Sequence, residues 1–296
     1  MASIQTWALA TRPKTLFAAV SPVLIGMAMA FGMNVFHPLS AILALISAVL
    51  IQIGTNFFND YADFESGADS ETRKGPVRGV LAGSISASAM KNAAIMTFGL
   101  AILAGGYLMY RGGWPIVLIG ACSISFGFLY TSGEYSLSRL GIADAFVFVF
   151  FGPVAVAGTY YVQALSWPPP IWLAGIAPGL MSVAILLVNN IRDIEEDRTA
   201  GKNTLVVRLG RTFGIRAYMA CLIGSALVAP VIVVAFGAPF MTMVASLVFV
   251  GGIPAVQILL ATNIENSDDL NPVLASTARL LFFYSILYSS AWVLNT

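Results

Sequence analysis

Two clusters of acidic and amide side chains stand at the ends of long apolar runs, within residues 56–63 and residues 189–197. In each cluster, Asn and Asp recur at helical spacing and therefore share one helix face. The residues concerned are Asn56, Asp60, Asp63, Asn189, Asp193 and Asp197. Carboxylate and amide oxygens without nearby Cys or His are typical Mg²⁺ ligands, and Mg²⁺ bound this way usually completes its shell with substrate phosphates. The pattern predicts a metal site that handles a diphosphate.

Basic residues follow both acidic clusters along the chain. Arg binds phosphate in a bidentate manner and Lys binds it as a point charge, so these loops could hold the diphosphate. The candidates are Arg73, Lys74, Arg78, Lys202 and Arg208. Arg12 and Lys14 precede the first apolar run and could reach the same place. For each of these residues, a simple role as an anchor at the membrane surface is the alternative.

Tyr61 and Tyr130 are the aromatic residues that the spacing places nearest to the acidic clusters. Packing in the core or at the membrane interface is the commoner role of such residues. An aromatic face can also stabilise a carbocation. We keep both interpretations at this point.

The composition is that of an integral membrane protein. Of the 296 residues, 58% are hydrophobic and 10% are charged, against about 25% charged in soluble domains. A spanning helix needs about 20 mostly apolar residues. Nine runs meet this need, and we expect one all-α transmembrane domain over residues 1–296. The runs cover approximately residues 15–33, 39–59, 88–109, 114–131, 140–162, 170–190, 213–236, 240–262 and 275–294.

The basic residues give the expected orientation. With nine spans, Arg111 alone of the 15 Lys and Arg falls on one side, and both acidic clusters fall on the other. The basic side of a membrane protein is the cytoplasmic side. We expect the N-terminus inside and the C-terminus outside the cell membrane. The net charge of +1 gives no sign of a nucleic-acid partner.

The order of acidic helix and basic loop occurs twice, in the second and sixth spans. This weak internal repeat predicts that the two helices face each other across one cavity. Four carboxylates in one cavity repel each other unless cations neutralise them. A cation-coupled transporter is an alternative, since transporters also use repeated halves. Carboxylates at the cytoplasmic end, rather than at the midplane, favour a one-sided enzyme.

In several segments the chain resembles the UbiA superfamily of membrane prenyltransferases, and the match extends over almost its whole length. The aspartate motifs carry the resemblance to the superfamily. Further segments are typical of its naphthoate branch more than of its hydroxybenzoate branch. The matching segments are residues 12–15, 21–24, 59–64, 67–69, 151–156, 158–161, 189–193 and 201–210.

This resemblance implies nine helices around a central cavity, with Mg²⁺, a polyprenyl diphosphate donor and an aromatic acceptor. For the naphthoate branch, the acceptor is 1,4-dihydroxy-2-naphthoate, and loss of CO₂ and diphosphate gives demethylmenaquinol. 4-Hydroxybenzoate and homogentisate remain alternative acceptors. The implied location is the cell inner membrane. The expected catalytic residues are Asp60, Asp63, Asp193, Asp197 and Tyr130, and the expected acceptor-binding residues are Arg12, Lys14, Arg139 and Tyr61.

Overall fold

The computed structural model describes residues 2–67, 79–131, 133, 136–262 and 270–295. Within these ranges the regular structure is helical and contains no strand. Eight stretches are long and apolar enough to cross a membrane, and the shorter apolar helix α5 (Trp114–Leu129) makes a ninth. The prediction of an all-α membrane protein with nine spans is confirmed.

Five of the long spans are single helices: α2 (Pro13–Gly32), α3 (Pro38–Glu65), α4 (Ala87–Gly112), α13 (Arg211–Phe236) and α15 (Asn271–Leu294). The other three are each built from two helices. They are α7 (Ala143–Phe150) with α8 (Pro153–Ala164), α9 (Pro169–Ala174) with α10 (Ile176–Arg192), and the 3-10 helix η1 (Phe240–Leu247) with α14 (Val248–Ala261).

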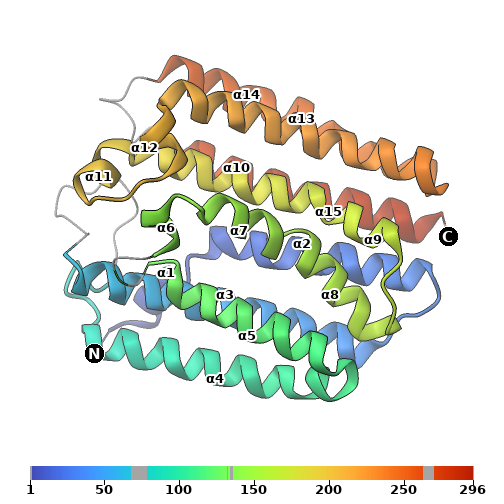
Figure 1. The fold of residues 1–296 in the computed structure, drawn as a ribbon, viewed down its shortest axis with the longest axis horizontal. Coiled ribbons are helices and arrows are strands. Elements are labelled where there is room, and N and C mark those ends of the chain that lie inside the picture. The colour runs from blue at the N-terminus through green and yellow to red at the C-terminus, as the bar shows by residue number, and fades with distance from the viewer. Residues whose placement is uncertain (1, 68–78, 132, 134–135, 263–269, 296) are drawn as a thin grey trace.

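The spans lie side by side as a bundle, and the two marked chain ends lie at opposite ends of it (Figure 1). Four short helices gather at the end that holds the N-terminus: α1 (Ile4–Ala10), α6 (Leu137–Leu140), α11 (Ile194–Thr199) and α12 (Leu205–Leu209). Opposite positions of the termini are expected of an odd number of crossings.

Glycine allows two of the broken spans to pack closely. A Cβ on Gly175 would meet the backbone of Pro153 and Gly152, and one on Gly152 would meet the carbonyl of Gly175. Pro153 also lacks an amide N–H and begins α8 at the break. The chain can therefore bend at both points and bring α7 and α8 against α9 and α10.

Burial follows the arrangement of the bundle. The largest buried cluster includes Ile25, Met181, Ile232 and Tyr288, from four different spans. Other large apolar side chains face outward, among them Leu103, which is 76% exposed. Lipid is the favourable environment for such a surface, because apolar side chains are unfavourable in water. The helices tolerate lipid, since they satisfy their backbone hydrogen bonds internally.

Candidate active site

A cavity of about 660 Å³ lies inside the bundle. One end is polar, and the rest is lined mainly by apolar side chains such as Val23, Ile51, Ile119 and Phe150. The polar and charged lining residues at the first end include Arg12, Asn56, Asp63, Tyr130, Asn189, Asp193, Glu196, Asp197 and Lys202. Such a cavity matches a molecule with a charged head and an apolar tail.

The first acidic cluster lies in the last turns of α3. Asn56, Asp60 and Asp63 are all buried, and Asn56 and Asp63 line the cavity. The Asn56 amide donates to the carbonyl oxygen of Thr11 at 2.8 Å and to the Thr15 hydroxyl at 3.0 Å. Asn56 thereby fixes the chain between α1 and α2 beside the cavity. The Asp60 carboxylate instead accepts a hydrogen bond from the backbone N–H of Gly79 at 3.1 Å.

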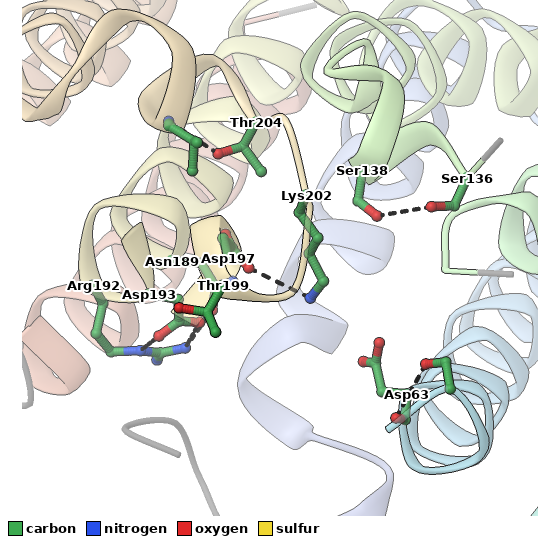
Figure 2. Close-up of polar contacts among 12 residues, drawn as sticks. Asp63, Ser136, Ser138, Asn189, Arg192, Asp193, Asp197, Thr199, Lys202 and Thr204 are labelled. Atoms are coloured by element: carbon green, nitrogen blue, oxygen red, sulfur yellow. Dashed lines mark hydrogen bonds and ion pairs between the residues drawn. The ribbon is translucent and has the colours of Figure 1, made fainter. Parts of the chain in front are cut away.

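The second cluster lies where α10 ends at Asp193 and α11 begins. Arg192 donates to both carboxylate oxygens of Asp193, each at 2.6 Å, and to the side-chain oxygen of Asn189 at 2.7 Å. It also donates to the side-chain oxygen of Asn271 on α15 at 2.8 Å. Arg192 thus neutralises Asp193 and joins the end of α10 to α15, as Figure 2 shows in part.

The two clusters face the same space. The Lys202 ammonium lies 3.4 Å from the Asp197 carboxylate, and Asp63 lies across from this pair in Figure 2. Burial raises the pKa of Asp197 to about 6, Lys202 opposes the rise, and the carboxylates of Asp193 and Asp63 add to it. The carboxylates are therefore close enough to interact, and negative charge accumulates at this end.

No three acidic, His or Cys side chains of the described residues come together as a metal-binding group. Two of the predicted ligands make other contacts instead: Asp193 with Arg192, and Asp60 with the Gly79 backbone. The donors are nevertheless those that suit Mg²⁺, because they are carboxylate and amide oxygens. A metal at Asp193 would compete with Arg192 for the same two carboxylate oxygens.

Tyr130 follows α5 and lines the cavity between the clusters. Burial raises the pKa of its phenol, the carboxylates of Asp144, Asp197 and Asp63 raise it further, and Arg12 lowers it. The phenol therefore stays protonated at neutral pH. It offers the cavity a hydrogen-bond donor and an aromatic face.

Some of the remaining predicted residues line the cavity and others do not. Arg12 and Lys202 are among the described residues that line the cavity, whereas Arg139 and Arg208 are not. Lys14 lines a different groove, with Phe17, Asn271 and Arg279. Tyr61 packs against Phe58, and the Lys91 ammonium lies over its ring. Arg73, Lys74 and Arg78 lie outside the described residues.

Several cavity residues were not predicted from the sequence, notably Asp144, Ser182, Asn190 and Glu196. Asp144 had a detectable signal, because it is an acidic residue at the start of an otherwise apolar run. Intramembrane acidic residues are costly and usually functional.

The fold and the site define a class: a helical membrane protein with acidic helix ends at the head of an apolar cavity. Residues 19–293 match the UbiA prenyltransferase family, and the chain belongs to this family.

Relatives with established names cover most of the chain. It is 41% identical over 230 residues to the 1,4-dihydroxy-2-naphthoate octaprenyltransferase of Escherichia coli, covering 76% of the chain and 74% of the relative. It is 34% identical over 296 residues to the enzyme of the same name from Haemophilus influenzae, covering 97% and 95%.

Solved structures share the fold at low sequence identity. A UbiA homolog from Aeropyrum pernix matches with a TM-score of 0.70 at 16% identity, covering 95% of this chain and 97% of that one. A UbiA homolog from Archaeoglobus fulgidus, solved bound to DMAPP and Mg²⁺, matches with a TM-score of 0.66 at 14% identity, covering 96% and 99%.

Proposed function

We propose that this protein transfers a polyprenyl group from a polyprenyl diphosphate to 1,4-dihydroxy-2-naphthoate, releasing CO₂ and diphosphate and giving a demethylmenaquinol. The relatives at 41% and 34% identity support this acceptor. The observation that carries the proposal is the cavity that is charged at one end and apolar beyond, which matches a prenyl diphosphate.

Mg²⁺ fits the charged end by its chemistry. The proposed ligands are Asp60, Asp63, Asp193 and Asp197, with Asn56 and Asn189 as neutral oxygen donors. A hard cation would relieve the repulsion that contributes to the raised pKa of Asp197. When bound, Mg²⁺ supplies electrostatic stabilisation of the leaving diphosphate. The Archaeoglobus homolog was solved bound to DMAPP and Mg²⁺, which supports this assignment.

The basic residues hold the diphosphate. Lys202 already lies in the cavity beside Asp197, so its ammonium can donate to a phosphate oxygen there. Arg12 lines the same end and offers a guanidinium to phosphate or to the acceptor's carboxylate. Preorganised positive charge of this kind stabilises the negative charge that develops as the allylic C–O bond ionises.

Aromatic side chains protect the resulting cation. Phe126 packs against Phe146 and Phe150, with ring centroids 4.3 Å and 4.7 Å apart, and all three line the cavity. With Tyr130, these rings stabilise an allylic cation and exclude water, which would otherwise trap it as the prenyl alcohol. The carboxyl-bearing ring carbon of the acceptor then attacks, and loss of CO₂ restores aromaticity.

We infer that the polar end of the bundle faces the cytoplasm. Fourteen of the 15 Lys and Arg fall on that side, which carries both aspartate clusters. The N-terminus then lies inside and the C-terminus outside the cell inner membrane.

An assay with purified protein tests the function. Mg²⁺ and a polyprenyl diphosphate are supplied with 1,4-dihydroxy-2-naphthoate, 4-hydroxybenzoate or homogentisate, and products are identified by mass spectrometry. The expected result is a prenylated, decarboxylated product from the naphthoate alone. Prenylation of another acceptor instead would overturn the acceptor assignment. Cation flux in sealed vesicles without product would favour the transporter.

A further inference from the structure

A buried carboxylate of the cavity takes no part in the proposed diphosphate site. Asp144 is the second residue of α7, is 8% exposed and lines the cavity. Its Oδ1 atom has no hydrogen-bond partner among the described residues. A position in the first turn of a helix favours negative charge, but it supplies no donor to this atom. A buried polar atom without a partner is costly and therefore calls for a ligand or another explanation.

Asp144 lies deeper in the bundle than Asp193. The carbonyl of Phe148 lies against Gly179, and Gly152 lies against Gly175, so α7 and α10 run antiparallel. This register places Asp144 opposite residue 183 of α10, about 15 Å along the helix from Asp193.

A second buried polar atom lies at the same depth. Ser182 also lines the cavity, and its hydroxyl has no partner among the described residues. A polar spot therefore exists beneath the charged end, inside the mainly apolar part of the cavity.

The surroundings of Asp144 match a flat aromatic ring. Phe146 is two residues further along α7, and its ring packs on Phe126. The Asp144 carboxylate raises the pKa of the Tyr130 phenol more than Asp197 or Asp63 does, which places Asp144 near that phenol. Aromatic rings, a hydrogen-bond acceptor and a hydrogen-bond donor thus all line this one cavity.

Charge sets the orientation of a ligand there. A carboxylate repels another anion nearby, so the ligand's own anionic group must point away from Asp144. The cavity provides Arg12 at its charged end for such a group. A hydroxyl on the far part of the ring can then donate to Asp144.

We propose that Asp144 binds the aromatic acceptor by accepting a hydrogen bond from the ring hydroxyl that lies farther from the acceptor's carboxylate. In 1,4-dihydroxy-2-naphthoate this is the 4-hydroxyl. The assignment rests on the proposed function and locates the acceptor ring against Phe126 and Phe146. It makes Asp144 an acceptor-binding residue separate from the metal ligands.

Two acceptors and two variants test this assignment. The acceptors are 1,4-dihydroxy-2-naphthoate and 1-hydroxy-2-naphthoate, which lacks the 4-hydroxyl. Asp144→Ala is expected to raise KM for the dihydroxy acceptor about ten- to a hundredfold, as for a hydrogen bond to a charged group. KM for the prenyl diphosphate should stay within about twofold. Asp144→Asn keeps a neutral oxygen that can accept a hydrogen bond, so its KM for the dihydroxy acceptor should rise less. This variant replaces Asp144→Ala in the test if the Ala variant does not fold.

The acceptor without the 4-hydroxyl gives the decisive comparison. Wild type should bind it about tenfold or more weakly than the dihydroxy acceptor, and the Asp144 variants should bind it as wild type does. Glu195→Gln is the matched control, because it removes one negative charge from an exposed pair with Arg198. Equal losses for both acceptors, or an unchanged KM in Asp144→Ala, would overturn the assignment.

The same experiments distinguish failure of the proposed function from failure of the Asp144 assignment. In that case wild type converts no 1,4-dihydroxy-2-naphthoate at all. Calorimetric titration of both acceptors into wild type and variants, without prenyl donor, then still measures whether Asp144 recognises the 4-hydroxyl.

Discussion

Replacement of Arg192 by Met should destabilise the metal-free protein and strengthen its response to Mg²⁺. Arg192 and Asp193 are both buried, and two hydrogen bonds of 2.6 Å join them. Loss of one partner of a buried ion pair leaves an uncompensated charge and costs about 3–5 kcal/mol. For a domain of this kind the cost corresponds to a fall of roughly 10 °C in the unfolding midpoint in EDTA.

Mg²⁺ should recover more of this stability in the variant than it adds to wild type. In wild type the ion competes with Arg192 for the carboxylate of Asp193, whose charge the guanidinium already neutralises. In Arg192→Met the carboxylate is free of that competitor. At a concentration of one hundred times Kd, a ligand stabilises the folded state by about 2.7 kcal/mol, and a lower Kd increases this contribution.

The assay is thermal unfolding in detergent, followed by intrinsic fluorescence, with EDTA or with increasing Mg²⁺. Arg111→Met is the matched control, because Arg111 donates to the carbonyl oxygens of Val162 and Gln163 and not to a carboxylate. It should lose stability without a larger Mg²⁺ response. An equal Mg²⁺-induced shift in wild type and Arg192→Met would refute the competition between Arg192 and the metal.

Three further outcomes are expected. Lys202→Ala should raise KM for the prenyl diphosphate about tenfold, since it removes a charge-assisted phosphate contact. It should lower the unfolding midpoint less than Arg192→Met does, because the Lys202 side chain is 23% exposed and its ammonium lies 3.4 Å from Asp197, whereas Arg192 makes two hydrogen bonds of 2.6 Å. Gly175→Ala should cost about 1–3 kcal/mol, read as a lower unfolding midpoint, because its Cβ would meet Pro153. Gly99→Ala, with open space at its Cβ, is the control, and equal midpoints would contradict the packing argument. A fluorescent-protein fusion at the C-terminus should stay dark if that end faces the periplasm, and bright fluorescence would contradict nine crossings with the N-terminus inside.

Much of the fold could be predicted because long apolar runs are a strong signal for spanning helices. Helical spacing also identified the polar ends of α3 and α10, since residues three or four apart share a helix face. The breaks at Gly152 and Gly175 could not be predicted. They depend on a close approach between the backbones of two consecutive spans, which the pattern of apolar residues does not show.

The contacts within the site were less accessible to prediction. Spacing placed Asp60 and Asp63 on one helix face, but it could not show that Asp60 is bound to the backbone of Gly79. The pairing of Arg192 with Asp193 depends on the rotamers of both side chains. It also depends on Asn271, which lies on a helix distant in sequence and accepts a hydrogen bond from Arg192. Asp144 was overlooked because a single acidic residue in an apolar run forms no spacing pattern.

The most direct test of the account is a double-mutant cycle on Asp63 and Asp197, with Mg²⁺-dependent binding of a polyprenyl diphosphate measured by calorimetry. If both helix ends hold one metal–diphosphate group, Asp63→Asn and Asp197→Asn each remove most of the affinity, and the double variant loses little more than either single one. Losses that simply add would show that the two carboxylates act at separate sites.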